Sequence, residues 1–124
     1  MTKKPKGGTL STSRLSDKKA RPPKEKNLIK KMKVLLEAHR LRMSDHANRR
    51  MKERNILYYE VLQALASGRH DAKRDRFNEE FNSWDYSIEG KTIDGRELRI
   101  GITFEVVPVS KEVILVLTVI DPKV

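Results

Sequence analysis

The spacing of apolar residues predicts helices once the polar start of the chain has been passed. Apolar residues recur at helical spacing over residues 28–39, with lysines largely on the opposite side. Residues 44–54 predict a second helix, which Ser44 is suited to cap. A third helix begins near Tyr58 and is expected to end at Gly68, where a left-handed cap belongs. The short link between the second and third helices predicts a helix hairpin.

The last third of the chain has the pattern of β-strands. Residues 86–92 alternate between apolar and polar and lead into Asp94-Gly95, a favoured dipeptide of the type I′ hairpin turn. Residues 98–106 place their apolar side chains on one face. Residues 113–120 are almost continuously apolar and β-branched, which predicts a central strand buried on both faces.

Two segments fit more than one structure. Residues 40–44 suit a short strand or an extended link, and residues 69–85 suit either a helical face carrying Phe77, Phe81 and Trp84 or part of a strand. The sum is a set of helices followed by antiparallel strands. We therefore predict an α+β fold, with N-terminal helices, including the helix hairpin, packed on a three- to four-stranded antiparallel sheet.

The composition of the first 26 residues differs from that of the rest. They are rich in Lys, Ser, Thr, Gly and Pro and have almost no large apolar residue. Such a segment cannot bury enough surface to offset its ordering entropy. We expect residues 1–26 to form a basic, disordered arm, and residues 27–124 to form a single α+β domain, since 124 residues leave no room for two.

The net charge of +10 is unevenly distributed along the chain. Residues 1–54 contain 18 Lys or Arg against 5 Asp or Glu, a charge of +13, whereas residues 55–124 contain 9 against 12, a charge of −3. This asymmetry favours a polyanionic partner on the N-terminal side, with nucleic acid first among them. The alternative is that the basic arm only keeps the protein in solution.

Several classes of site are disfavoured by what the sequence lacks. The chain has no cysteine, which excludes disulfides and thiolate sites. No apolar run approaches the roughly 20 residues of a membrane span, and the start lacks the apolar core of a secretory signal. The histidines have no carboxylate at a metal-binding spacing. We expect a cytoplasmic protein with no metal, no small-molecule cofactor and no membrane partner.

Three side chains of the second predicted helix form the first candidate site. His46, Arg50 and Arg54 recur every four residues and project from one side. An imidazole can transfer a proton near neutral pH, and guanidiniums stabilise charge on phosphate oxygens, a combination that suits phosphodiester cleavage. With RNA the 2′-hydroxyl is the nucleophile, so the chemistry needs neither metal nor serine. The alternative is structural: His46 packs or caps, and the arginines pair with nearby acids or water.

Other cations are candidates for nucleic-acid contact without catalysis. Gly90-Lys91-Thr92 lacks the upstream glycine of a P-loop and leads into a hairpin, so we reject that interpretation. A lysine on the sheet surface can still bind phosphate, as can an arginine on the following strand. The candidates for nucleic-acid binding are Lys91, Arg96, Arg99, Arg49, Lys30 and Lys31.

Two stretches resemble a prokaryotic family known as domain of unknown function 4258. The first contains Ser44, His46-Ala47, Arg50-Met51, Arg54 and Ile56, followed by Val61-Leu62 and Gly68. The second contains Tyr86, Ile88, Gly90-Lys91-Thr92, Asp94-Gly95-Arg96 and Leu98, followed by residues 114–120. The resemblance covers roughly residues 41–121. The chain departs from the family pattern at Leu57, where a capping Ser is common, and in its long basic arm.

This resemblance implies a small α+β domain like those of the RelE/ParE and BrnT toxins. That wider group includes ribonucleases that are neutralised by cognate antitoxin proteins, although the ParE branch acts on gyrase. By position, the family's His-Ala and following arginines fall on His46, Ala47, Arg50 and Arg54. Our leading hypothesis is a toxin-like, metal-independent endoribonuclease that binds RNA or ribosome-associated RNA and is paired with an antitoxin. Its rivals are a non-catalytic module that binds nucleic acid or protein, and a toxin that traps a protein target through its sheet.

Overall fold

The computed structural model describes residues 20–108 and 111–123. Within these residues three α-helices, α1 (Leu28–Glu37), α2 (Asp45–Glu53) and α3 (Tyr58–Ala66), are followed by most of the strands, which confirms the α+β class. The first nineteen residues of the expected arm lie outside the described part of the chain. No helix of the described residues is long and apolar enough to cross a membrane.

The sheet is larger than the three or four antiparallel strands predicted. Among the described residues it has six strands, and their bounds are β1 (Leu41–Met43), β2 (Arg69–His70), β3 (Arg76–Asn78), β4 (Ser83–Lys91), β5 (Glu97–Val107) and β6 (Lys111–Ile120). The order is β1-β6-β5-β4-β2, with β3 paired to the beginning of β4. β1 runs parallel to β6, so the sheet is mixed. The two segments left open in the sequence supply the additional strands.

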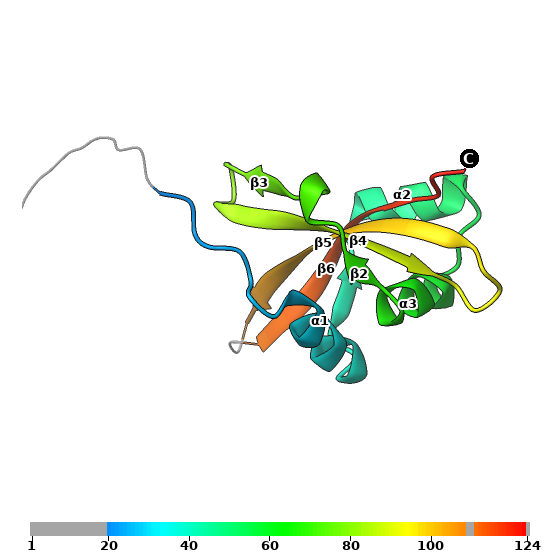
Figure 1. Cartoon of the computed structure of the whole chain (residues 1–124), viewed down its shortest axis with the longest axis horizontal. Coiled ribbons are helices and arrows are strands. Elements are labelled where there is room, and N and C mark those ends of the chain that lie inside the picture. Colours follow the sequence, from blue (N-terminus) through cyan, green and yellow to red (C-terminus); the bar gives the residue numbers. More distant parts are fainter. Residues whose placement is uncertain (1–19, 109–110, 124) are drawn as a thin grey trace, which may run out of the picture.

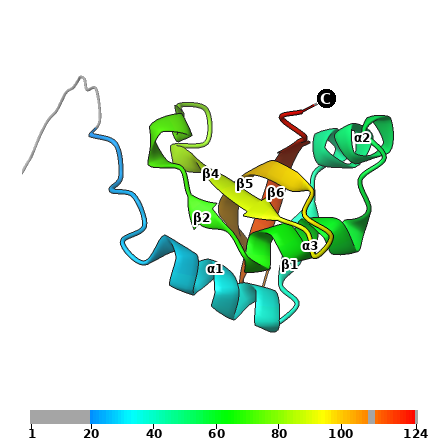
Figure 2. The same ribbon diagram turned by 45° about the vertical axis from the view of Figure 1, so that its right-hand side comes forward.

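The predicted helix hairpin does not describe how α2 and α3 pack. Asn55, with a φ of 56°, turns the chain after α2, and α2 then lies against β6 and β1. α3 instead lies against β4 and β5 and beside α1, and α1 also lies against β6 (Figures 1 and 2). Each helix has one narrow apolar stripe, and this stripe packs against the sheet. The N-cap of α2 is confirmed, because Ser44 Oγ accepts a hydrogen bond from Ala47 N at 3.0 Å.

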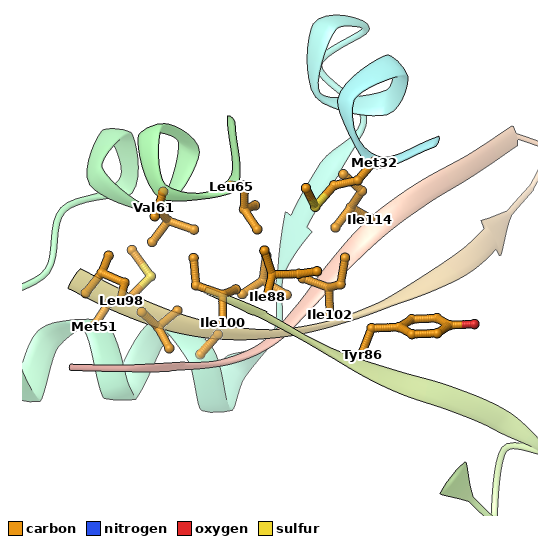
Figure 3. Packing of buried hydrophobic residues seen from close by; sticks show 14 of the residues in the cluster. Met32, Met51, Val61, Leu65, Tyr86, Ile88, Leu98, Ile100, Ile102 and Ile114 are labelled. Atoms are coloured by element: carbon orange, nitrogen blue, oxygen red, sulfur yellow. The ribbon is translucent and has the colours of Figure 1, made fainter. Parts of the chain in front are cut away.

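The core lies between the inner face of the sheet and the helices. Val61 and Leu65 of α3 point toward Ile88 and Ile100, and Met32 of α1 lies beside Ile114 of β6 (Figure 3). All of these side chains are buried. β6 is an interior strand as predicted, but only its inner face is fully buried, and Leu115 and Leu117 on the other side remain partly exposed. The opposite, outer face of the sheet is therefore less well covered.

Two glycines allow α3 to approach β4 closely. A Cβ atom on Gly90 would lie 1.8 Å from the Ala64 carbonyl oxygen, and one on Gly68 would lie 2.5 Å from Ile88 Cγ2. Gly68 is not among the residues with positive φ, so the predicted left-handed cap is wrong. The β4–β5 turn also differs from prediction: Gly95 has a φ of 92°, but Asp94 does not share the positive φ that a type I′ turn requires at both central residues.

Residues 21–25, here called the strap, cover the end of the inner face that the helices leave open. Trp84 Nε1 donates to the Pro22 carbonyl at 2.8 Å, and the Glu25 backbone N–H donates to Tyr86 Oη at 2.9 Å. The Arg21 guanidinium lies 4.7 Å from the centroid of the Phe77 ring. Residues 21–25 therefore make tertiary contacts although their composition placed them in the basic arm, because cation–π and backbone contacts substitute for apolar burial.

Candidate nucleic-acid interface

Strand alternation determines which side chains reach the outer face. Tyr86 and Ile88 of β4 are buried in the core, so the residues between and beside them point the other way. Two hollows lie on this outer face, and none of the residues that line them belongs to α1, α2 or α3. The lysine hollow, of about 420 Å³, is lined by Ser67, Arg69, Glu89, Gly90, Lys91, Glu97, Leu98, Arg99 and Pro122. The arginine hollow, of about 330 Å³, is lined by Arg74, Arg76, Asp85, Tyr86, Ser87, Arg99, Gly101, Leu117, Thr118 and Ile120.

Small side chains on three neighbouring strands make the floor of the arginine hollow. Ser87 of β4 is paired with Gly101 of β5, and Gly101 is paired with Thr118 of β6. These residues form one row across the sheet, and a Cβ on Gly101 would already lie 3.1 Å from Thr118 Cγ2. A β-bulge follows immediately, where the register shifts between Gly101 and Ile102. The hollow thus results from a lack of side-chain volume at three paired positions.

Arg99 lies between the two hollows and lines both. Its Nε is buried and has no hydrogen-bond partner among the described residues. A buried donor without an acceptor destabilises the folded protein by about 1–3 kcal/mol. Such a cost is unusual in a native structure and points to a function for this side chain. Arg99 was one of the cations predicted to bind nucleic acid, and the structure places it at the centre of the outer face.

The charges around Arg99 are only partly neutralised within the fold. Arg69 pairs with Glu89 at 3.3 Å, and Arg74 pairs with Asp71 at 3.1 Å. Arg76 of β3 and Lys91 at the end of β4 make no side-chain ion pair or hydrogen bond with other described residues. The outer face therefore presents uncompensated positive charge at both ends, with Arg99 in the middle.

Asp85 is the one carboxylate among the residues lining the arginine hollow. It lies on β4 directly opposite Arg76 on β3. Burial raises the pKa of the Asp85 carboxyl above its ordinary value, and a hydrogen bond with the Asn78 side chain opposes that shift.

The predicted catalytic row does not contribute to either hollow. His46 is exposed on the first turn of α2, and Arg50 Nη1 forms an ion pair with Glu53 Oε1 at 3.3 Å. Arg54 is the C-cap residue of α2, and its carbonyl accepts a hydrogen bond from Arg96 Nη2 at 2.7 Å. His46 and Arg50 lie on α2 and Arg54 caps its end, close to what the spacing predicted. The arginine hollow is lined by other cations, Arg74, Arg76 and Arg99.

Arg96, also predicted to contact nucleic acid, is occupied inside the protein. Its Nε donates to Asp121 Oδ2 at 2.9 Å, and its Nη1 lies 3.4 Å from Glu60 Oε1. The Glu60 carboxylate also accepts from the Leu57 backbone N–H at 2.9 Å, so it caps α3 from the third helical position. This cap explains how Leu57 is tolerated where a capping Ser was expected.

The remaining predicted cations lie away from the hollows. Arg49 is exposed on α2. Lys30 and Lys31 line a groove of about 720 Å³ between α1 and the strap. Lys31 Nζ is 2.8 Å from both Glu25 and Glu112, so its charge is largely compensated.

Sequence reasoning missed a compact network around Asp75, whose side chain is 1% exposed. Asp75 Oδ2 is 2.7 Å from His70 Nε2 and 2.9 Å from Lys24 Nζ, and its Oδ1 accepts from the Ser87 backbone N–H. The strap is thus attached to the sheet through Lys24. No described group of three or more His, Cys, Asp or Glu residues could hold a metal ion.

Sequence reasoning also missed Arg74, Arg76 and Asp85. Residues 69–76 contain four Lys or Arg and two Asp, but they lie in the part of the chain, residues 55–124, that is negative overall, so their arginines did not stand out. Arg74 and Arg76 flank Asp75, and Asp85 lies nine residues beyond Arg76 in the sequence, so spacing did not link the three. Pairing of β3 with β4 was needed to show that Arg76 faces the same hollow as Arg99.

Comparison with known proteins identifies the family but no activity. No curated protein matches the chain, and no solved structure matches it. The likeness to RelE, ParE and BrnT toxins therefore stays a prediction. A family model described as domain of unknown function (DUF4258) matches residues 43–121, which include α2, α3, the arginine hollow and all of the lysine hollow except Pro122. The chain belongs to this family.

Proposed function

We propose that this protein binds RNA in the cytoplasm through the outer face of its sheet, with the phosphodiester backbone held by Arg99. The observation that carries the proposal is the position of Arg99 between two hollows, with its Nε buried and unpartnered among the described residues. Arginine forms charge-assisted hydrogen bonds with phosphate oxygens, and such contacts supply most of the affinity of sequence-independent binding.

Arg76 and Lys91 support the same proposal. They lie at opposite ends of the outer face. In the strand register, Arg76 of β3 is the neighbour of Asp85, and Lys91 at the end of β4 is the neighbour of Glu97. Asp85 and Lys91 are six residues apart on β4, which corresponds to about 20 Å of extended strand. A strand of nucleic acid laid along β4 would therefore meet positive charge at its middle and at both ends.

The shape of the face favours a single strand over a duplex. Direct reading of a duplex requires a helix or a two-stranded ribbon that enters a groove. The hollows are recesses and not projections, so they suit phosphates of a flexible strand. RNA is the proposed class because the sequence resemblance implies a domain like those of toxins that act on RNA, and the 2′-hydroxyl gives the protein a means of distinguishing RNA from DNA.

Binding of a fluorescein-labelled single-stranded RNA, followed by fluorescence anisotropy from 50 to 300 mM salt, tests this proposal. We expect Arg99→Gln to weaken binding about tenfold and to lower the salt slope by about one, the effect of losing one phosphate contact. Arg76→Gln should have a similar effect. Lys33→Gln, which removes one charge from an exposed position of α1, is the matched control. Equal affinities for all three variants would mean that RNA does not use the outer face.

A second candidate function, protein binding, is favoured by exposed apolar side chains near the start of α3. Leu57, Tyr58 and Tyr59 are 50 to 56% exposed, and Ile93 is 86% exposed. The Ile93 backbone N–H donates to Gln63 Oε1 at 2.9 Å, which holds the β4–β5 turn against α3. An antitoxin-like protein encoded beside this chain is the proposed occupant. Titration with that protein should show binding that Ile93→Arg weakens and Arg99→Gln does not.

A further inference from the structure

The position of Asp85 raises a question that RNA binding alone does not answer. A carboxylate in a hollow that receives a phosphate repels it, and the repulsion is stronger where water is partly excluded. Asp85 lines the hollow together with Arg74, Arg76 and Arg99, and it is partly buried there. A site selected only for phosphate affinity would be better without this side chain.

The surroundings of Asp85 keep it available for proton transfer. It makes no ion pair with another described residue, and its hydrogen bond is with the neutral Asn78 side chain. Burial raises its pKa, which makes the carboxylate a stronger base than an exposed aspartate. The floor of small residues, Ser87 and Gly101, leaves space beside it for a ribose.

We propose that Asp85 is the general base of an RNA-cleaving site in the arginine hollow, with Arg76 and Arg99 holding the reacting phosphate. This inference rests on the proposed RNA binding and adds a reaction to it. The site differs from the His46, Arg50 and Arg54 row, because it lies on the sheet and takes its proton acceptor from β4.

The reaction is a transesterification within the RNA strand. The Asp85 carboxylate accepts the proton of a ribose 2′-hydroxyl while O2′ attacks the adjacent phosphorus. A P–O2′ bond forms as the P–O5′ bond breaks, and negative charge develops on the non-bridging oxygens near Arg76 and Arg99. The leaving O5′ takes a proton from water, and the hydroxide left behind removes the proton from Asp85. The products are a 2′,3′-cyclic phosphate and a 5′-hydroxyl end, and no oxidant or reductant is needed.

Comparison of cleavage and binding by Asp85→Asn tests the inference directly. A mixed-sequence, end-labelled RNA is incubated with wild-type protein or with the variant in buffer containing EDTA, with and without bacterial ribosomes. We expect the wild type to release a 2′,3′-cyclic phosphate and Asp85→Asn to cut at least 100-fold more slowly, the usual contribution of a general base. The variant should bind RNA as tightly as the wild type or more tightly, because it removes a repulsive charge. A merely structural aspartate would not give that combination.

Two further variants separate catalysis from folding. Asp85→Glu keeps a carboxylate and should retain partial activity, and Glu80→Gln, at an exposed position of the β3–β4 connection, should cut normally. The wild-type rate should rise with pH as Asp85 loses its proton, and Asp85→Asn should lose that rise. RNA with a 2′-deoxy sugar at the cleavage position should bind but stay intact.

The outcomes distinguish failure of cleavage from failure of binding. If the wild type binds RNA but leaves it intact with and without ribosomes, or if Asp85→Asn cuts as fast as wild type, the inference is wrong and the binding proposal stands. If neither protein binds RNA, both proposals are wrong. Retained cleavage in Asp85→Asn that is lost in His46→Ala would assign catalysis to α2.

Discussion

The guanidinium of Arg96 donates to the carboxylate of Asp121 at 2.9 Å and so joins the start of β5 to the end of β6. The same guanidinium also donates to the carbonyls of Arg54 and Asn55, between α2 and α3. One side chain therefore holds three separate parts of the chain together. An arginine that looked available for nucleic acid is a structural residue in this protein.

Arg96→Gln should destabilise the protein substantially. It removes the ion pairs with Asp121 and Glu60 and leaves those partly buried carboxylates without their cation, at an expected cost of about 2 kcal/mol in the free energy of unfolding. Urea unfolding followed by circular dichroism measures the change. Arg42→Gln is the control, because its ion pair with Glu105 is exposed and should contribute less than about 1 kcal/mol. Equal costs for the two variants would contradict this role for Arg96.

Asp121 should contribute to acid sensitivity. The Lys123 backbone N–H and the Arg96 guanidinium lower the pKa of its carboxyl in the folded protein below the unfolded value of about 3.9. The resulting stability is present above pH 4 and is lost as the pH falls through the folded pKa. Urea midpoints should therefore differ between wild type and Asp121→Asn at pH 6 and converge toward pH 2. A difference that stays constant with pH would rule out this linkage.

Asp75→Asn should release the strap. The change leaves Lys24 and His70 without their buried carboxylate, a loss of about 3 kcal/mol by comparison with other broken buried pairs. Trp84 is the only tryptophan of the chain and contacts Pro22 and Lys24 of the strap, so its fluorescence reports whether the strap has detached. Its fluorescence maximum should shift to longer wavelength under native conditions. Asp71→Asn, which affects a more exposed pair with Arg74, should leave the spectrum unchanged.

Gly90→Ala should destabilise the fold by more than the difference in backbone conformational preference between Gly and Ala can explain. The added Cβ would lie 1.8 Å from the Ala64 carbonyl oxygen, so α3 must move away from β4. We expect a loss of about 3 kcal/mol, at the upper end of overpacking effects. Gly95→Ala changes a residue with a φ of 92° and open space around it, and should cost about 1 kcal/mol. Thermal unfolding of both variants compares steric overlap with backbone strain, and a larger loss for Gly95→Ala would contradict the contact.

The His46 row should have little effect on RNA affinity. His46→Ala and Arg50→Ala change exposed or surface-paired side chains on α2, outside both hollows. Each should alter the dissociation constant for single-stranded RNA by less than about threefold, since a distant exposed charge is largely screened at 0.15 M salt. Arg99→Gln measured in parallel provides the comparison. A tenfold loss in His46→Ala would instead place the RNA on α2.

The sequence by itself determined the local features of this protein. The apolar stripes of the helices, the Ser44 cap and the alternation of β4 and β5 depend on neighbouring residues, and all were readable from spacing. The family was readable as well, because its motifs lie in consecutive stretches of residues 43–121.

Only the tertiary structure decided the candidate site. The row formed by Ser87, Gly101 and Thr118 depends on the pairing of three strands, and a one-residue change of register would remove it. Nothing in the sequence distinguishes Arg76 and Arg99 from Arg96. In the structure Arg76 and Arg99 line the arginine hollow, whereas Arg96 forms ion pairs and hydrogen bonds inside the protein. Charge can be counted along a chain, but whether a cation is neutralised depends on which distant carboxylates and carbonyls the fold brings within reach.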